Sequence, residues 1–192
     1  MSTSNREKWN RIYGNGGDNP PTAAQVLAEF DYLLPVTGHA LDLACGRGGN
    51  ALLLARHGLD TWAWDISDAA VEQLRERARN EGVRIDVQQR DVSAMPPEPG
   101  TFDVIVVSRY LERALAPRLI LALRKQGLLF YQTFIKEKSA DTGPRNPDYL
   151  LGPNELLDMF HSLHVICYRE EGRLGDSNRG LRNEAMLIAQ KR

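Results

Sequence analysis

The sequence predicts an α/β fold: an open, doubly wound sheet, mostly parallel, with an antiparallel hairpin near the C-terminus. Short apolar runs alternate with helix-length segments over residues 39–134, as in parallel β-α-β units with right-handed crossovers. Glycines stand at the boundaries between the apolar runs and the helix-length segments. The chain has 192 residues, 42% of them apolar, which suffices for one such domain and is too short for two.

Each expected element has a local signal in the sequence. Apolar runs of strand length predict strands over 39–45, 60–66, 84–91, 102–108 and 128–134. Helical patterns predict helices over 49–57, 68–80 and 154–160. Gly58 ends the first helix, Asp68 is expected to cap the second, and a turn is expected at Gly127. The polar, proline-rich stretch 135–153 predicts a loop, and 164–171 with 183–191 predict the terminal hairpin.

Composition and charge exclude several classes of protein. Lys and Arg number 24 against 25 Asp and Glu, so no overall basic field is available to hold nucleic acid. The first ten residues are polar, and no run approaches the roughly 20 apolar residues of a membrane span, which predicts a cytoplasmic protein without membrane contact. Cys45 and Cys167 lie far apart with no histidine cluster nearby, so neither a disulfide framework nor a metal site is expected.

The stretch LDLACGRGGNA, residues 41–51, predicts a cofactor loop. Its G-x-G-x-x-A pattern (Gly46, Gly48, Ala51) and Asp65, 19 residues after Gly46, fit an NAD-binding fingerprint. Asp42, four residues before Gly46, argues against NAD, because a carboxylate beside a diphosphate is unfavourable. S-adenosylmethionine carries a sulfonium and an ammonium instead, so Asp42 favours this cationic cofactor.

The same stretch resembles the first motif of the class I S-adenosylmethionine-dependent methyltransferases, an acid followed by x-G-x-G-x-G. Asp42, Gly46 and Gly48 match it, and Ala44 replaces the first glycine. The resemblance implies a Rossmann-like, seven-stranded sheet completed by the C-terminal hairpin. It also implies a cofactor-covering segment over 1–36, a cofactor-binding core over 37–134, and a substrate loop with the hairpin over 135–192.

The resemblance further implies which residues contact the cofactor. Asp65 stands where the family binds the ribose hydroxyls, Asp91 where it binds the adenine amino group, and Ser108 at the mouth of the fourth strand. Neighbouring residues complete the expected set, namely Ala44, Cys45, Ile66 and Val92. As single residues, Asp65 and Asp91 could also be ordinary turn formers, and Cys45 a small packing residue.

A narrower resemblance concerns EKWNRIYGN, residues 7–15. It is similar to the W-x-x-x-Y segment of small-molecule methyltransferases of the thiopurine and tellurite-resistance kind, in which Trp9 and Tyr13 would close over the cofactor. The same spacing also fits an apolar stripe packed on the core. The last hairpin turn has arginines but no histidine, so a histidine-dependent role is not carried over.

The acceptor side is predicted from the residues that follow the later strands. Candidates to position an acceptor are Arg109, Tyr110, Tyr131, Thr133, Arg145, Arg173 and Arg182. Together the arginines could form a cationic pocket for a soft or anionic small molecule, such as a thiol or a metalloid or chalcogen oxyanion. No protein nucleophile is expected, since such an acceptor needs only alignment. An NAD-dependent oxidoreductase and a non-catalytic S-adenosylmethionine-binding protein remain alternatives, and the sequence leaves the oligomeric state open.

Overall fold

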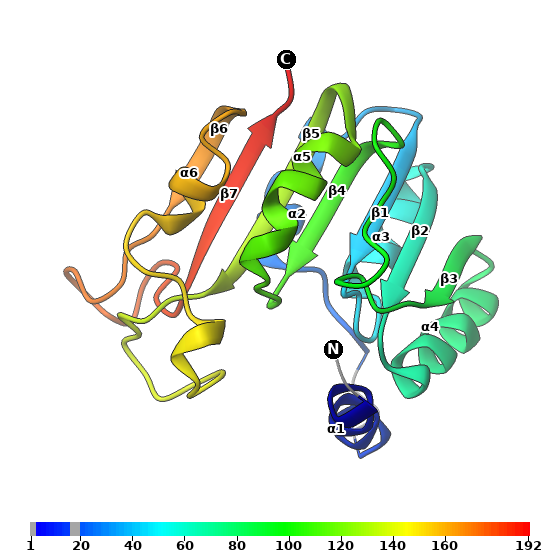
Figure 1. Cartoon of the computed structure of the whole chain (residues 1–192), viewed down its shortest axis with the longest axis horizontal. Helices are drawn as coiled ribbons and strands as arrows, with labels where there is room; N and C mark the ends of the chain where they lie inside the picture. The colour runs from blue at the N-terminus through cyan, green and yellow to red at the C-terminus, as the bar shows by residue number, and fades with distance from the viewer. Residues whose placement is uncertain (1–2, 16–19) are drawn as a thin grey trace.

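The computed structural model describes residues 3–15 and 20–192, and its centre is a seven-stranded sheet in the order β3-β2-β1-β4-β5-β7-β6 (Figure 1). The strands are β1 (His39–Leu43), β2 (Asp60–Asp65), β3 (Ile85–Gln89), β4 (Phe102–Ser108), β5 (Leu123–Phe134), β6 (His164–Arg169) and β7 (Glu184–Gln190). Neighbouring strands from β3 to β5 pair in parallel, and β7 pairs antiparallel with both β5 and β6. The predicted α/β fold with its C-terminal antiparallel hairpin is confirmed.

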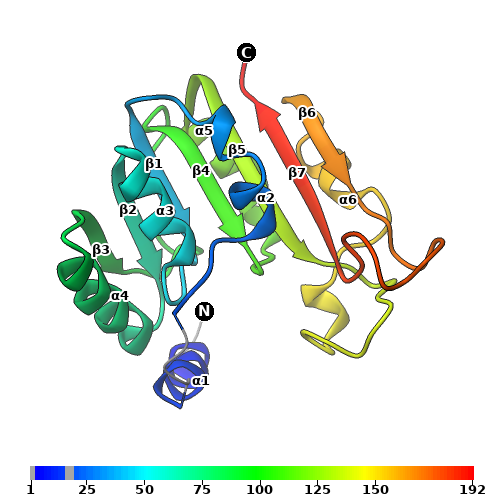
Figure 2. The same ribbon diagram turned by 180° about the vertical axis from the view of Figure 1, so that it is seen from behind.

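Helices cover both faces of this sheet. They are α1 (Thr3–Gly14), α2 (Gln25–Ala28), α3 (Gly49–His57), α4 (Asp68–Glu81), α5 (Ala116–Ala122) and α6 (Glu155–Met159), with 3-10 turns η1 (Asp31–Leu33), η2 (Arg113–Leu115) and η3 (Pro147–Tyr149). α5 and α6 lie on the face seen in Figure 1, and α2 and α3 on the face seen in Figure 2. The fully buried Leu119 and Phe160 pack on the first face, and Leu27 and Leu54 on the second.

Two local expectations were wrong. The hydroxyl of Ser67, not the carboxylate of Asp68, caps α4 by accepting from the amide of Ala70 (3.2 Å). Asp68 is instead turned towards α1, where Arg6 donates to it (2.8 Å). The turn expected at Gly127 is a bulge within β5, because pairing resumes with extra residues between Leu123 and Leu128.

The carboxyl ends of β1 to β4 meet at one edge of the sheet, and α1 lies across this edge (Figures 1 and 2). Loops at this edge of an open α/β sheet are where ligands bind. Among the described residues, no helix is both long and apolar enough to cross a membrane.

Candidate cofactor and acceptor site

The loop between β1 and α3 is built around left-handed backbone. Gly46 (φ 51°) and Gly48 (φ 84°) adopt it, and so does Ala44 (φ 56°), which stands where the family has its first glycine. A Cβ on Gly48 would lie 2.2 Å from a methyl group of Leu74, so α4 packs directly against the loop. Position 48 therefore requires glycine both for its backbone conformation and for this packing.

Asp42 lies directly beneath this loop, fully buried in β1. Its carboxylate accepts from the amide of Ala51 (3.0 Å) and from the side-chain Nδ2 of Asn50 (3.2 Å), both in the first turn of α3. Burial raises the pKa of Asp42 to about 7, against the lowering effect of these two hydrogen bonds. The carboxylate therefore caps α3 in this structure, and its contact with a cofactor stays a prediction.

Asp65, at the end of β2, fixes the same loop from the neighbouring strand. Its two oxygens accept from the amides of Gly46 (2.8 Å) and Ser67 (2.9 Å). Burial raises the pKa of Asp65, and these backbone hydrogen bonds oppose that rise. The backbone carbonyl of Ile66 accepts from Gln89, which ties the end of β2 to the end of β3.

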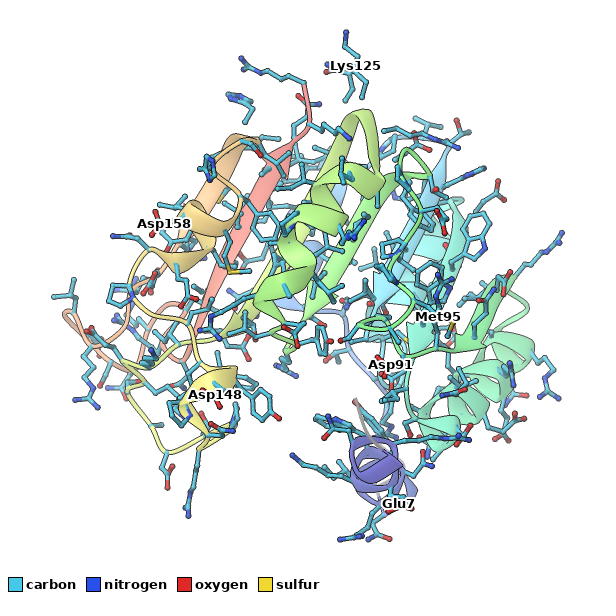
Figure 3. All side chains as sticks on the ribbon, viewed as in Figure 1. Glu7, Asp91, Met95, Lys125, Asp148 and Asp158 are labelled. Atoms are coloured by element: carbon cyan, nitrogen blue, oxygen red, sulfur yellow. The ribbon has the colours of Figure 1, made fainter. Side chains whose placement is uncertain are left out.

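Asp91 follows β3 and begins the loop that leads to β4 (Figure 3). Its carboxylate accepts from the amide of Ser93 (3.0 Å), and Val92 between them is buried. Asp42, Asp65 and Asp91 thus come from β1, β2 and the end of β3, and all three are brought to the edge that the glycine loop occupies. The structure brings together the acids that the sequence singled out.

Asn50 is a site residue that sequence reasoning missed. Besides Asp42, its Nδ2 donates to the hydroxyl of Ser108 (3.0 Å), and its Oδ1 accepts from the amide of Ala24 (2.8 Å). It therefore joins the ends of β1 and β4 to the segment that leads into α2. The available signal was a single amide, Asn50, in the otherwise apolar start of α3.

α1 covers the glycine loop through Tyr13. The rings of Trp9 and Tyr13 stack with their centres 5.8 Å apart, and a Cβ on Gly46 would lie only 2.7 Å from the Tyr13 hydroxyl. Burial, with a contribution from the Asp65 charge, raises the pKa of Tyr13. The side chain of Gln73 in α4 donates to the Tyr13 carbonyl (3.0 Å), so the helix is docked over the loop.

On the acceptor side, Arg109 and Tyr110 diverge at the end of β4. Arg109 has left-handed backbone (φ 53°), and its Nε donates to the carboxylate of Glu184 (2.9 Å). The Tyr110 hydroxyl lies 3.2 Å from that of Ser93, so the ring is directed towards the loop after β3. The buried Tyr131 donates its hydroxyl to the Tyr110 carbonyl (2.9 Å). Tyr110 therefore faces the side predicted to hold adenine.

The other candidate arginines each have a partner within the loops of the acceptor side. Arg145 pairs with Asp141 (2.9 Å), and the Arg173 Nε donates to the Lys138 carbonyl (2.9 Å). Arg182 donates to backbone carbonyls of the loop before β7, at residues 172, 174, 176 and 179. Thr133 is buried within β5. These three arginines order the loops around the site.

A second missed residue is Arg113, in the turn that follows β4. Its guanidinium donates to the carbonyls of Asp148 (2.7 Å) and Leu150 (3.1 Å) and pairs with Glu155. It therefore holds η3, the part of the 135–152 loop that lies beside the carboxyl edge (Figure 3). Because its partners lie 35 to 42 residues away, no local pattern marks it.

Comparison with known proteins agrees with this arrangement. Residues 40–126 match the family described as Methyltransferase domain. The ubiquinone biosynthesis O-methyltransferase of Coxiella burnetii is 26% identical over 147 residues, which are 71% of this chain and 63% of that protein. The chain therefore spans less than two thirds of this curated relative.

Solved structures show the same fold across the whole chain. TehB from Haemophilus influenzae superposes with a TM-score of 0.70 at 19% identity, covering 96% of this chain and 67% of that one. Geranyl diphosphate C-methyltransferase from Streptomyces coelicolor superposes with a TM-score of 0.74 at 13% identity, covering 100% and 99%. Residues 40–126 thus match the methyltransferase family, and the Rossmann-like, seven-stranded sheet of this chain superposes on solved methyltransferases.

Proposed function

We propose that this protein transfers a methyl group from S-adenosylmethionine to a small-molecule acceptor with a soft or anionic nucleophile. The observation that carries the proposal is the placement of three acids at the carboxyl edge: Asp42 and Asp65 hold the left-handed glycine loop and the start of α3, and Asp91 follows β3. Carboxylates suit the ammonium, the ribose hydroxyls and the adenine amino group of this cofactor. The negatively charged diphosphate of NAD would be repelled by these carboxylates.

The order of the strands also favours this cofactor over NAD. The dinucleotide-binding sheet has six parallel strands in the order 3-2-1-4-5-6. Here an antiparallel β7 is inserted between β5 and β6. The strand that distinguishes this sheet from the dinucleotide-binding sheet, β7, lies beside the acceptor side. Its residue Glu184 forms an ion pair with Arg109.

The residues of this chain would act by binding, orienting and covering. S-adenosylmethionine, when bound, would supply a methyl group on a positively charged sulfur that an acceptor's lone pair could displace. Asp65 and Asp42 hold the loop and the start of α3 in place, and Tyr13 covers the loop. Alignment with exclusion of water is the main requirement of such an in-line displacement.

The placement of the histidines supports an acceptor that arrives already reactive. The four histidines of the chain are at positions 39, 57, 161 and 164. They lie at the start of β1, the end of α3 and the approach to β6, all at the amino edge of the sheet. An imidazole base is therefore remote from the site, and a thiolate or an oxyanion needs none.

The first experiment compares thermal unfolding with S-adenosylhomocysteine and with NAD. A ligand that binds the folded state raises the melting temperature, and at 100 times its Kd it adds about 2.7 kcal/mol. We expect a rise with S-adenosylhomocysteine alone; a rise with NAD alone would support an oxidoreductase and overturn the proposal.

The second experiment tests the acceptor class. Transfer of labelled methyl groups is measured with 2-mercaptoethanol, selenite, tellurite and catechol as acceptors. Methylation of a thiol or chalcogen oxyanion supports the proposal, and methylation of catechol alone would favour an oxygen acceptor, as in the name of the Coxiella relative. Cofactor binding without turnover on any acceptor would favour a non-catalytic role. The cytoplasmic location stays a prediction.

A further inference from the structure

A lysine links the two segments that flank the acceptor side. The Lys8 ammonium of α1 lies 5.6 Å from the ring centre of Trp9 and 5.7 Å from that of Tyr149 in η3. Both distances are within the range of cation–π attraction. We propose that Lys8 recognises negative charge on the acceptor, an inference that rests on the proposed methyl transfer and deepens it.

Two arginines at this edge are matched by carboxylates. Arg109 pairs with Glu184, and Arg113 pairs with Glu155. The contacts of Lys8 are of a different kind, because an aromatic ring attracts a cation through its quadrupole and carries no net charge. The rings therefore position the ammonium while leaving its charge available to a ligand.

Lys8 is not required to hold these two segments in place. α1 is anchored on α4 by Arg6 and Asn10, which both donate to Asp68 (2.8 and 3.1 Å). The segment around Tyr149 is anchored independently by Arg113. An exposed cation–π contact contributes little to the free energy of folding, so replacing Lys8 should leave the fold intact.

The surroundings limit how large the effect can be. Glu7 and Asp148 are exposed acids next to Lys8 and Tyr149 in sequence, and Figure 3 shows Glu7 on the outer side of α1 and Asp148 on η3. Lys8 is itself exposed, so water and salt screen its charge. We therefore expect a discrimination of about tenfold, which corresponds to about 1.4 kcal/mol.

The test uses three thiols that share a two-carbon chain and carry a negative, a neutral or a positive end group: 2-mercaptoethanesulfonate, 2-mercaptoethanol and 2-aminoethanethiol. For the wild type we expect kcat/KM for the sulfonate to exceed that for the amine about tenfold at low salt. Lys8→Met should remove this ranking while changing the rate with 2-mercaptoethanol less than twofold, and Lys8→Arg should keep it. Lys125→Met is the matched control, because Lys125 is exposed at the opposite edge (Figure 3). An unchanged ranking in Lys8→Met would overturn the inference.

A binding measurement separates failure of this inference from failure of the proposed function. If no thiol is methylated, thermal shifts of the protein saturated with S-adenosylhomocysteine are measured with benzenesulfonate and with neutral benzenesulfonamide. A larger shift with the sulfonate in the wild type and Lys8→Arg, and its loss in Lys8→Met, supports anion recognition independently of turnover. Equal shifts in all three proteins would refute it.

Discussion

Replacing Asn50 with alanine tests whether the amide holds the site together. The substitution removes three hydrogen bonds, to Asp42 (3.2 Å), Ser108 (3.0 Å) and the amide of Ala24 (2.8 Å). A buried group that loses its partner costs about 1–3 kcal/mol; the Asp42 oxygen is such a group, and the Ala24 amide, which is partly buried, also loses its partner. We expect the free energy of unfolding to fall by about 3 kcal/mol, allowing for water at the partly exposed Ser108.

The assay is urea unfolding followed by circular dichroism. With a slope of about 2 kcal/mol per molar urea, a loss of 3 kcal/mol moves the midpoint down by about 1.5 M. Asn80→Ala, an exposed position near the end of α4, is the matched control and should stay within about 0.5 kcal/mol of the wild type. A midpoint for Asn50→Ala that equals the control, at unchanged slope, would refute the assignment of a central role to Asn50.

Asn50→Asp sharpens the test, because it keeps the shape and replaces the donor with an oxygen facing Asp42 at about the same 3.2 Å. Two carboxylates at this distance repel by about 5 kcal/mol at an effective dielectric constant of 20, so one would retain its proton. This variant should be much less stable at pH 8 than at pH 5. Equal stability at both values would contradict the geometry.

Three further outcomes follow from the described contacts. Gly49→Ala places a Cβ 2.2 Å from a backbone oxygen of the segment before α2 and should unfold at least 5 °C lower in a thermal scan, whereas Gly14→Ala, with nothing within 4 Å, should not. Arg113→Ala should speed limited proteolysis within 135–152 while lowering stability by only about 1 kcal/mol, and an unchanged cleavage rate would deny its role in holding η3. The pKa of Asp42, about 7 when folded against 3.8 as its ordinary value, means that the unfolded chain loses this proton first as pH rises. The free energy of unfolding should therefore fall by about 3 kcal/mol from pH 5 to pH 8, and Asp42→Asn should reduce this slope in urea titrations.

The elements that sequence reasoning predicted correctly are those with local signals. α3 and α4 end where Gly58 and Gly82 provide left-handed backbone, and the buried strands read as continuous apolar runs. The bulge around Gly127 depends instead on pairing with β4, and α5 on burying Leu119 against the sheet. Such long-range contacts leave little trace in the local pattern.

The same distinction holds for the site. Acids at strand ends could be placed at one edge in advance, because parallel strands bring their carboxyl ends together. Asn50 could not be found in this way, because its role depends on a hydrogen bond to Ser108, which lies 58 residues later in the sequence. Arg182 was predicted as an acceptor candidate from its residue type, whereas its hydrogen bonds to the carbonyls of the loop before β7 depend on the folded loop and could not be predicted.

The buried carboxylate of Asp42 connects stability with cofactor binding. Burial makes its ionised form unfavourable in the folded protein, which is why its pKa rises to about 7. A cationic cofactor bound at this loop would favour the ionised form and lower that pKa, so binding should release a proton and tighten as pH rises from 6 to 8. Calorimetry of S-adenosylmethionine binding in two buffers with different ionisation enthalpies measures this proton. Binding that releases none near pH 6.5 would mean that Asp42 serves α3 alone and that the cofactor's charge is met elsewhere.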